Sequence, residues 1–209
     1  MVGRIIETDA CVQEGAAWLG SHDPRFARAL QLVGPLPLRR KADGFAALFD
    51  AIIGQQVSTL SAAATWARLQ AAGLTEEDAV RAAPPDVLRA CGLSRQKIRY
   101  AHALAAARID YPALRTLPDA QVIATLTAVP GIGPWTAEIY AMFSLGRADV
   151  FAHGDLAMQE AARRLFDLPE RPREKSMRVL AESWSPWRSV AARILWAYYQ
   201  NSTAQEGIR

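Results

Sequence analysis

The sequence is poor in cysteine. Its 209 residues include only Cys11 and Cys91, and the wide spacing of this pair provides neither a CxxC motif nor a disulfide framework. Two cysteines are also too few for a four-cysteine iron–sulfur cluster. We therefore expect a reducing compartment, no disulfide, no iron–sulfur cluster and no metal site.

Long apolar runs, a targeting leader and strand-like alternation are missing too. No apolar stretch is long enough to span a bilayer, and the N-terminus lacks a basic region followed by an apolar run. Valine and isoleucine do not alternate with polar residues between turn signals, as they do in half-buried strands. These absences predict a soluble cytoplasmic protein that has no membrane partner and no sheet.

A strong charge of one sign is absent as well. Lysine and arginine number 24 against 21 acidic residues, so the net charge is only +3. A small basic excess is compatible with a nucleic-acid partner, but many proteins without one share it. Since 51% of the residues are hydrophobic, the chain has enough apolar material for one large or two small domains.

The chain does contain a succession of helix signals. Apolar residues recur at helical spacing, Pro, Ser, Thr or Asp stands where segments begin, and Gly or Pro stands where they end. The expected helices include residues 10–19, 24–33, 45–53, 59–69, 95–108, 156–166, 174–184 and 186–199, before a weakly ordered tail from about Asn201. The predicted fold class is therefore all-α.

One stretch, VPGIGPWTA at residues 129–137, organises the rest of the chain. Pro130 ends a helix that begins near residue 118, and Pro134 suits the first turn of the helix that follows. Gly131 and Gly133 allow a tight turn with positive φ and present no Cβ to an approaching group. The pattern predicts a helix, a hairpin and a second helix.

Such a hairpin places backbone donors at the start of a helix. The amides of Ile132, Gly133 and Trp135 are expected to stay unpaired there, where the helix dipole also favours an anion. A nucleic-acid phosphate suits this site. The alternative is an αα-hairpin that uses Pro and Gly for its turn and binds nothing, but Asp155, placed 22 residues after Gly133, favours the functional interpretation.

Residues 129–155, VPGIGPWTAEIYAMFSLGRADVFAHGD, resemble the hairpin and catalytic-aspartate segment of the helix-hairpin-helix DNA glycosylase superfamily, specifically its 3-methyladenine DNA glycosylase II branch. Further similarity lies in IGQQVS at 53–58, CGLSRQK at 91–97 and WSPWRSVA at 184–191, so that it covers about residues 21–200. The resemblance implies two helical lobes with an active-site cleft between them. One lobe combines 1–44 with 146–209, and the other is 45–145, with the helix-hairpin-helix at 118–145.

The resemblance also implies individual roles. DNA binding is expected from the hairpin residues Gly131, Ile132, Gly133, Trp135 and Thr136. A turn between two helices is expected to insert the Gln56 side chain into the DNA stack, where it fills the space of an extruded nucleotide. The alternative is one continuous helix in which Gln55 and Gln56 are solvated or bonded to backbone.

Asp155 is the expected catalytic residue. Cleavage of an N-glycosidic bond builds positive charge on the sugar, which a fixed carboxylate opposes. Asp155 begins a predicted helix, whose N-terminal dipole favours an ionised side chain. The carboxylate could stabilise the sugar cation, activate water or do both, and the alternative is an ordinary helix N-cap. Asp149 is the nearest rival, but it is expected to be a structural loop residue.

Aromatic side chains are candidates for the base pocket, because an alkylated purine is cationic and attracted to aromatic faces. Trp135 is the best candidate, and Tyr140, Trp18 and Trp187 could equally be core residues. Family members that also cut the DNA backbone place a lysine at the position of Trp135. The resemblance therefore implies a monofunctional enzyme that leaves an abasic site.

The resulting hypothesis is an alkylbase DNA glycosylase of base-excision repair. It would act as a monomer on double-stranded DNA that contains damaged bases, at the nucleoid, without a cofactor, although the resemblance allows a monovalent cation on the hairpin carbonyls. The alternatives are a helix-hairpin-helix glycosylase for a deaminated or mismatched base, and a duplex-binding module without chemistry. Two basic runs, 39–41 and 95–99, could contact DNA or could simply be solvated.

Overall fold

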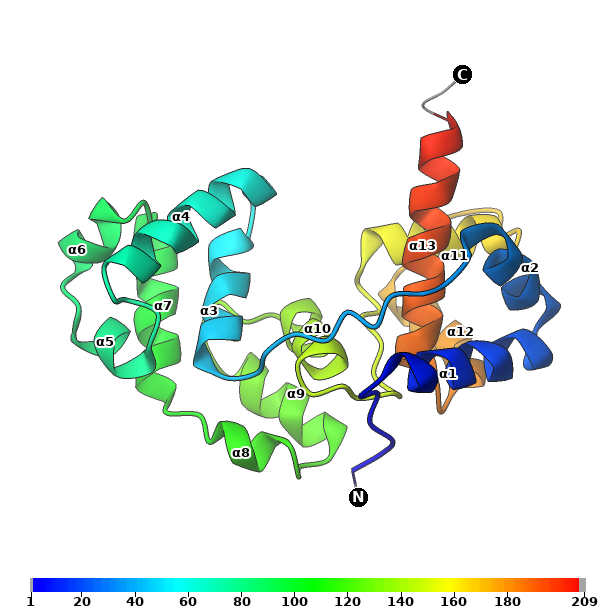
Figure 1. The fold of residues 1–209 in the computed structure, drawn as a ribbon, viewed down its shortest axis with the longest axis horizontal. Helices are drawn as coiled ribbons and strands as arrows, with labels where there is room; N and C mark the ends of the chain where they lie inside the picture. The colour runs from blue at the N-terminus through cyan, green and yellow to red at the C-terminus, as the bar shows by residue number, and fades with distance from the viewer. Residues whose placement is uncertain (1, 207–209) are drawn as a thin grey trace. The chain divides into compact units, whose positions relative to one another are not determined.

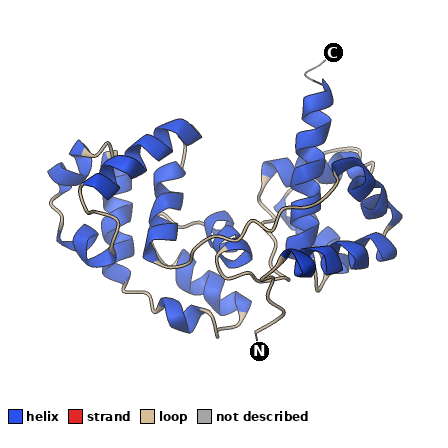
Figure 2. Cartoon of the chain, in the orientation of Figure 1, coloured by secondary structure: helices blue, strands red, loops and turns tan. Residues whose placement is uncertain are grey.

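A computed structural model describes residues 2–206, and helices are the regular elements within that range (Figure 1, Figure 2). They are α1 (Asp9–His22), α2 (Pro24–Val33), α3 (Phe45–Gly54), α4 (Thr59–Ala71), α5 (Glu77–Ala82), α6 (Pro85–Ala90), α7 (Arg95–Ala107), α8 (Tyr111–Leu114), α9 (Asp119–Thr127), α10 (Pro134–Phe143), α11 (Leu156–Leu165), α12 (Glu174–Ala181), the 3-10 helix η1 (Glu182–Trp184) and α13 (Arg188–Glu206). The predicted all-α class is confirmed, since β-type pairing in this range is limited to an isolated bridge between Ile5 and Arg147. No helix within 2–206 has the length and apolar character needed to cross a bilayer.

The helix starts follow the local signals of the sequence. Asp23, Ser58 and Ser94 each accept a hydrogen bond from a backbone N–H two or three residues further on, at the starts of α2, α4 and α7. Pro24 occupies the first turn of α2, where a missing N–H costs nothing. These caps lie where the sequence predicts them.

The helix ends depart from the predictions more often. The four-residue helix α8 is not predicted, and the segment expected to be helical through Trp184 becomes the 3-10 helix η1 at Glu182. The last predicted helix ends at Tyr199, whereas α13 continues through Glu206. The Thr203 hydroxyl donates to the Tyr199 carbonyl within that last part of the helix, at 2.9 Å. Residues 207–209 of the expected tail lie outside the described residues.

The described chain divides into two compact units. Unit 1 comprises Val2 and Lys41–Tyr140, and unit 2 comprises Gly3–Arg40 and residues 141–206. The second division falls inside α10, after Tyr140. The lobes expected from the sequence divide the chain at 44/45 and 145/146 instead.

Unit 1 is built around α3 and α7. These two helices pack against each other, α4 packs on α3, and α5 and α6 pack on α7. Phe49 and Ile52 of α3, Leu69 of α4 and Leu104 of α7 are fully buried, and burial of such side chains contributes about 1.5–3 kcal/mol each. This core fixes the end of α3 and the start of α7, both of which reach the candidate site.

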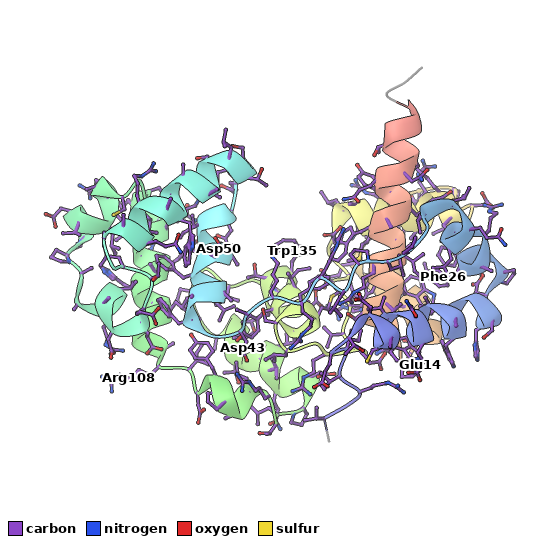
Figure 3. The ribbon with its side chains drawn as sticks, in the orientation of Figure 1. Glu14, Phe26, Asp43, Asp50, Arg108 and Trp135 are labelled. Atoms are coloured by element: carbon purple, nitrogen blue, oxygen red, sulfur yellow. The ribbon has the colours of Figure 1, made fainter. Side chains whose placement is uncertain are left out.

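Unit 2 is built around α13, which lies beside α1, α2 and α11 (Figure 1). A cluster of aromatic rings fills its interior, with ring centroids 5.3–5.7 Å apart; its members are Phe26, which Figure 3 labels on α2, Phe151, Phe166 and Trp184. Aromatic pairs at these distances stabilise a core beyond their area of burial. The packing of α11 on α13 fixes the start of α11, where Asp155 stands.

Candidate functional site

The hairpin between α9 and α10 uses its two glycines differently. Gly131 has a φ of +96°, whereas Gly133 does not have a positive φ. The prediction of positive φ is therefore right only for Gly131. A Cβ on Gly131 would lie 2.4 Å from Cγ of Tyr100, but a Cβ on Gly133 would meet no atom within 4 Å. Gly131 therefore permits close packing inside unit 1, while Gly133 leaves an open surface.

The donors of the hairpin also differ from one another. The Ile132 N–H donates to the Val129 carbonyl at 3.0 Å, so the expectation that this amide is open is wrong. Gly133 is exposed, and its N–H takes part in no hydrogen bond among the described residues. It precedes α10, whose N-terminal dipole favours an anion. Thr136, in contrast, is buried, so its side chain does not contribute to that surface.

The turn after α3 has the break that the sequence predicts. Gln55 is extended, and Gln56 has a φ of +56°, which is uncommon for a residue with a side chain. The alternative of one continuous helix is therefore wrong. The Gln55 amide Nε2 donates to the Gly131 carbonyl at 2.9 Å, and this bond ties the turn to the hairpin.

The start of α7 contacts both of these segments. The Lys97 ammonium donates to the Ile53 carbonyl at the end of α3, and burial lowers the pKa of this lysine. The Tyr100 ring lies against Gly131, and its hydroxyl accepts from Gln96 Nε2 at 2.7 Å. Lys97 is thus bonded to the backbone at the end of α3, and its predicted role as a DNA contact or a solvated charge stays a prediction.

The turn, the hairpin and the start of α7 border one cavity of about 620 Å³ within unit 1. It is lined by Gln55, Gln56, Val57, Gly92, Ser94, Gln96, Lys97, Tyr100, Gly131, Ile132 and Gly133. Among these lining residues Lys97 is the one charged side chain. Neutral amides, hydroxyls and backbone groups of this kind can bind base edges, sugars or phosphates.

Asp155 stands at the N-cap of α11 in unit 2. Its Oδ1 accepts from the Met158 backbone N–H at 2.9 Å and from the indole Nε1 of Trp196 at 3.1 Å. The first bond is the ordinary cap that the sequence left as an alternative. The second bond comes from Trp196 of α13, 41 residues further along the chain. An N-cap needs only the first bond, and the second one further fixes the direction of the carboxylate.

Sequence reasoning missed Trp196. Its ring stacks on Phe143, with centroids 5.5 Å apart, and the Arg39 guanidinium lies 5.6 Å from its centroid. The sequence does contain one signal, because Trp196 directly follows the inward-facing Leu195, and the indole N–H of a buried tryptophan usually donates a hydrogen bond. Nothing local in the sequence joins that donor to Asp155.

Two of the predicted pocket aromatics are core residues. Tyr140 is 4% exposed, its hydroxyl accepts from the Gly44 N–H at 2.8 Å, and burial raises its pKa to about 12. Trp187 is 3% exposed and packs against Gly15, where a Cβ would lie 2.6 Å from its ring. Since both rings are already covered within their own units, the structure favours the core alternative for both.

The other two aromatic candidates reach the surface. Trp135 is 46% exposed at the start of α10, where Figure 3 labels it. Trp18 is partly exposed on α1 and stacks on His22, with ring centroids 3.8 Å apart. Asp149 is structural as expected, because its carboxylate accepts from Ser185 Oγ at 2.7 Å and pairs with Arg188.

Within residues 2–206, no three His, Cys, Asp or Glu side chains gather in a way that could hold a metal ion. Cys11 and Cys91 are free thiols.

Comparison with known proteins identifies the family. Residues 49–186 match the model of the HhH-GPD superfamily of base excision DNA repair proteins. The chain is 30% identical to DNA-3-methyladenine glycosylase 1 of Schizosaccharomyces pombe over 190 residues, which are 85% of this chain and 83% of that protein. It is also 30% identical to DNA-3-methyladenine glycosylase 2 of Escherichia coli over 168 residues, 74% of this chain and 57% of that one.

Solved structures agree with this match. The DNA-3-methyladenine glycosidase of Bacillus halodurans superposes with a TM-score of 0.81 and 30% identity, covering 98% of this chain and 95% of that one. The S. pombe 3-methyladenine DNA glycosylase in complex with abasic DNA superposes with a TM-score of 0.76 and 28% identity, covering 88% and 95%. The chain belongs to the HhH-GPD superfamily of base excision DNA repair proteins, and the predicted resemblance is confirmed.

Proposed function

We propose that the chain is a monofunctional DNA N-glycosylase that extrudes alkylated, cationic purines such as 3-methyladenine from duplex DNA and hydrolyses the bond between base and sugar. The observation that carries this proposal is the Asp155 carboxylate, one oxygen of which is held by the Met158 N–H and the Trp196 indole. The names of the relatives support the substrate class, which is the one expected from the sequence.

The carboxylate opposes the charge that develops during the reaction. As the bond between C1′ of the deoxyribose and the base nitrogen breaks, positive charge builds on the sugar. A carboxylate already held in position stabilises that charge without reorganising as the reaction proceeds. Asp155 can also accept a proton from the attacking water, and both roles are compatible with its geometry.

The leaving group explains why the site needs few base-specific contacts. A cationic alkylated purine departs with the electron pair of the broken bond and is released as a neutral base. The oxygen of a water molecule then bonds to C1′, and its proton passes to Asp155 or to solvent. Because the leaving group is already activated, protonation of the base by a second acid is not required.

Unit 1 is proposed to hold the DNA. The open N–H of Gly133 at the start of α10 suits a backbone phosphate. Gln56, in its left-handed turn beside the cavity of about 620 Å³, is the proposed side chain that fills the space of the extruded nucleotide. Trp135 is the proposed aromatic surface for the cationic base.

Several further properties belong to the same proposal. The lysine needed for strand cleavage by Schiff-base chemistry is replaced by Trp135 in this chain, and Lys97 is bonded to the Ile53 carbonyl. We propose that the protein acts as a monomer at the nucleoid and uses no cofactor. A monovalent cation on the hairpin carbonyls remains a proposal, and Gly131 and Val129 already accept one hydrogen bond each through their carbonyls.

A lesion panel tests the proposal. Duplexes that contain 3-methyladenine, uracil, hypoxanthine or a G·T mismatch are incubated with the protein, and free bases are separated by chromatography. Release of 3-methyladenine from strands that break only after alkali treatment is the expected result. Release of only the deaminated or mismatched base supports the alternative enzyme, and duplex binding without any release supports a non-catalytic module.

A further inference from the structure

Two adjacent arginines end the first segment of unit 2. Arg39 and Arg40 are both exposed. Arg39 has a φ of +53°, a left-handed conformation that is unfavourable for a residue with a Cβ. Such strain persists where the surrounding structure holds the residue in place, and it is often found at functional sites.

Each guanidinium is held by packing. The Arg39 guanidinium carbon lies 5.6 Å from the centroid of the Trp196 ring, a cation–π contact. The Arg40 guanidinium lies against the backbone of Gly146, where an added Cβ would be 2.3 Å from Nη1. Within residues 2–206 neither arginine forms an ion pair with a carboxylate, so both charges are positioned without being neutralised.

A third arginine lies close to this pair. Arg193 is 1% exposed and donates to the Leu38 carbonyl at 2.8 Å and to the Ser189 hydroxyl at 2.7 Å. Its burial, together with the charges of Arg39 and Arg40, lowers its pKa to about 10. The acceptors of Arg193 are uncharged, so within residues 2–206 none of these three arginines is bonded to a carboxylate.

The same indole joins this cluster to the proposed catalytic carboxylate. Trp196 donates from Nε1 to Asp155 and carries the Arg39 guanidinium over its ring. A nucleotide whose C1′ faces Asp155 also brings the negatively charged phosphodiesters on its 5′ and 3′ sides close to this carboxylate. Cations within the length of one nucleotide can bind those phosphates, and guanidinium groups bind phosphate oxygens in a paired geometry.

We infer that Arg39 and Arg40 form a phosphate-binding site for a phosphodiester next to the extruded nucleotide. This inference rests on the proposed function and adds a DNA contact in unit 2 to the hairpin contact in unit 1. Arg39 is held over Trp196 and Arg40 over Gly146, so that both guanidiniums are ordered before the DNA arrives. This preorganisation lowers the entropy lost on binding.

The test measures affinity for a duplex that contains a tetrahydrofuran abasic-site analogue, at a series of salt concentrations. The logarithm of the binding constant falls as the logarithm of the salt concentration rises, and loss of one phosphate contact makes this slope less steep by about 0.9. Each single variant, Arg39→Ala or Arg40→Ala, should reduce affinity several-fold at low salt and make the slope less steep by about one. The double variant should make it less steep by about two. Arg28→Ala is the matched control, since Arg28 is an exposed arginine of α2 in the same unit.

Charge-preserving variants separate binding from folding. Arg39→Lys and Arg40→Lys keep the charge but lose the planar group, so they should retain the slope and bind more weakly. Thermal unfolding of every variant identifies any that do not fold. Wild-type slopes in both alanine variants, or a slope change as large in Arg28→Ala, would overturn the inference.

Base release from methylated DNA distinguishes this inference from the proposed function. If the wild-type protein releases base while the alanine variants bind with its slope, the inference fails and the function stands. If the wild type releases no base but the alanine variants lower the slope as expected, the phosphate site stands and the proposed function fails.

Discussion

Units 1 and 2 offer a nucleic acid two different kinds of chemistry. The cavity of unit 1 is lined by amides, hydroxyls and backbone groups, and Lys97, its one charged lining side chain, is bonded to the Ile53 carbonyl. The site residues of unit 2 are charged, with Asp155 held by an indole and Arg39 held over the same ring. Neutral groups suffice to grip a strand, because helix and backbone dipoles attract phosphate. Bond cleavage requires a full charge in a fixed place.

The largest effect is expected at Gly131 of unit 1. Gly131→Ala combines a φ of +96° with a Cβ 2.4 Å from Tyr100, and each of these problems costs about 1–3 kcal/mol. The variant should have a much lower thermal midpoint. Gly133→Ala, whose Cβ meets no atom within 4 Å, should keep the wild-type midpoint and lose DNA affinity instead. Equal midpoints for the two variants would contradict this division of roles.

The next effect is expected in unit 2. Trp196→Phe keeps a ring against Phe143 but removes the N–H that donates to Asp155. A hydrogen bond to a charged group contributes about 1.5–3 kcal/mol, so single-turnover base release should slow by at least tenfold. Trp184→Phe is the control, because the Trp184 indole N–H has no hydrogen-bond partner among the described residues. A similar rate loss in both variants would assign the effect of Trp196→Phe to packing.

A smaller effect is expected where the turn meets the hairpin. Gln55→Met keeps the length of the side chain but loses the bond to the Gly131 carbonyl. It should cost about 1 kcal/mol of stability and several-fold in duplex affinity. Gln96→Met changes another residue that lines the same cavity, but the bond that it loses joins Tyr100 on the same helix. If DNA affinity falls as much in Gln96→Met, the link between turn and hairpin has no special role.

The smallest effect concerns α11, the helix that Asp155 begins. Hydrogen bonds from Arg163 and Arg164 lower the pKa of Glu160 to about 2. A carboxyl with a lowered pKa in the folded state adds stability above its ordinary pKa, and this stability is lost as the pH falls toward 2. The urea midpoint of Glu160→Gln should therefore drop less than that of wild type between neutral pH and about pH 3. An equal drop in both proteins would show that Glu160 does not contribute in this way.

The sequence predicts those parts of the fold that depend on neighbouring residues. Pro24, Ser58 and Ser94 mark helix starts through local backbone chemistry, and the break at Gln56 follows from the glycine before it and the cap after it. The extension of α13 beyond Tyr199 is missed, because side-chain bonds within the helix and the Asn201 bond to the Leu32 carbonyl favour it. From the sequence alone, the polar residues after Tyr199 suggest a tail and not a continued helix.

The candidate site is less predictable, because its decisive bonds join distant residues. Asp155 and Gly133 follow from motif spacing, but Trp196 lies 41 positions after Asp155. Gln55 and Gly131 are 76 positions apart. Only the fold sets these distances. The left-handed conformation of Arg39 has no local signal either, since arginine has no preference for it.

The most direct test of the central claim compares wild type with Asp155→Asn on one methylated duplex, measuring single-turnover base release and duplex affinity together. The asparagine oxygen can still accept from Met158 and Trp196, so the fold and the grip of unit 1 should persist. We expect unchanged affinity and salt dependence, with release slowed by about 10²- to 10⁴-fold. Release at the wild-type rate by Asp155→Asn would contradict the account.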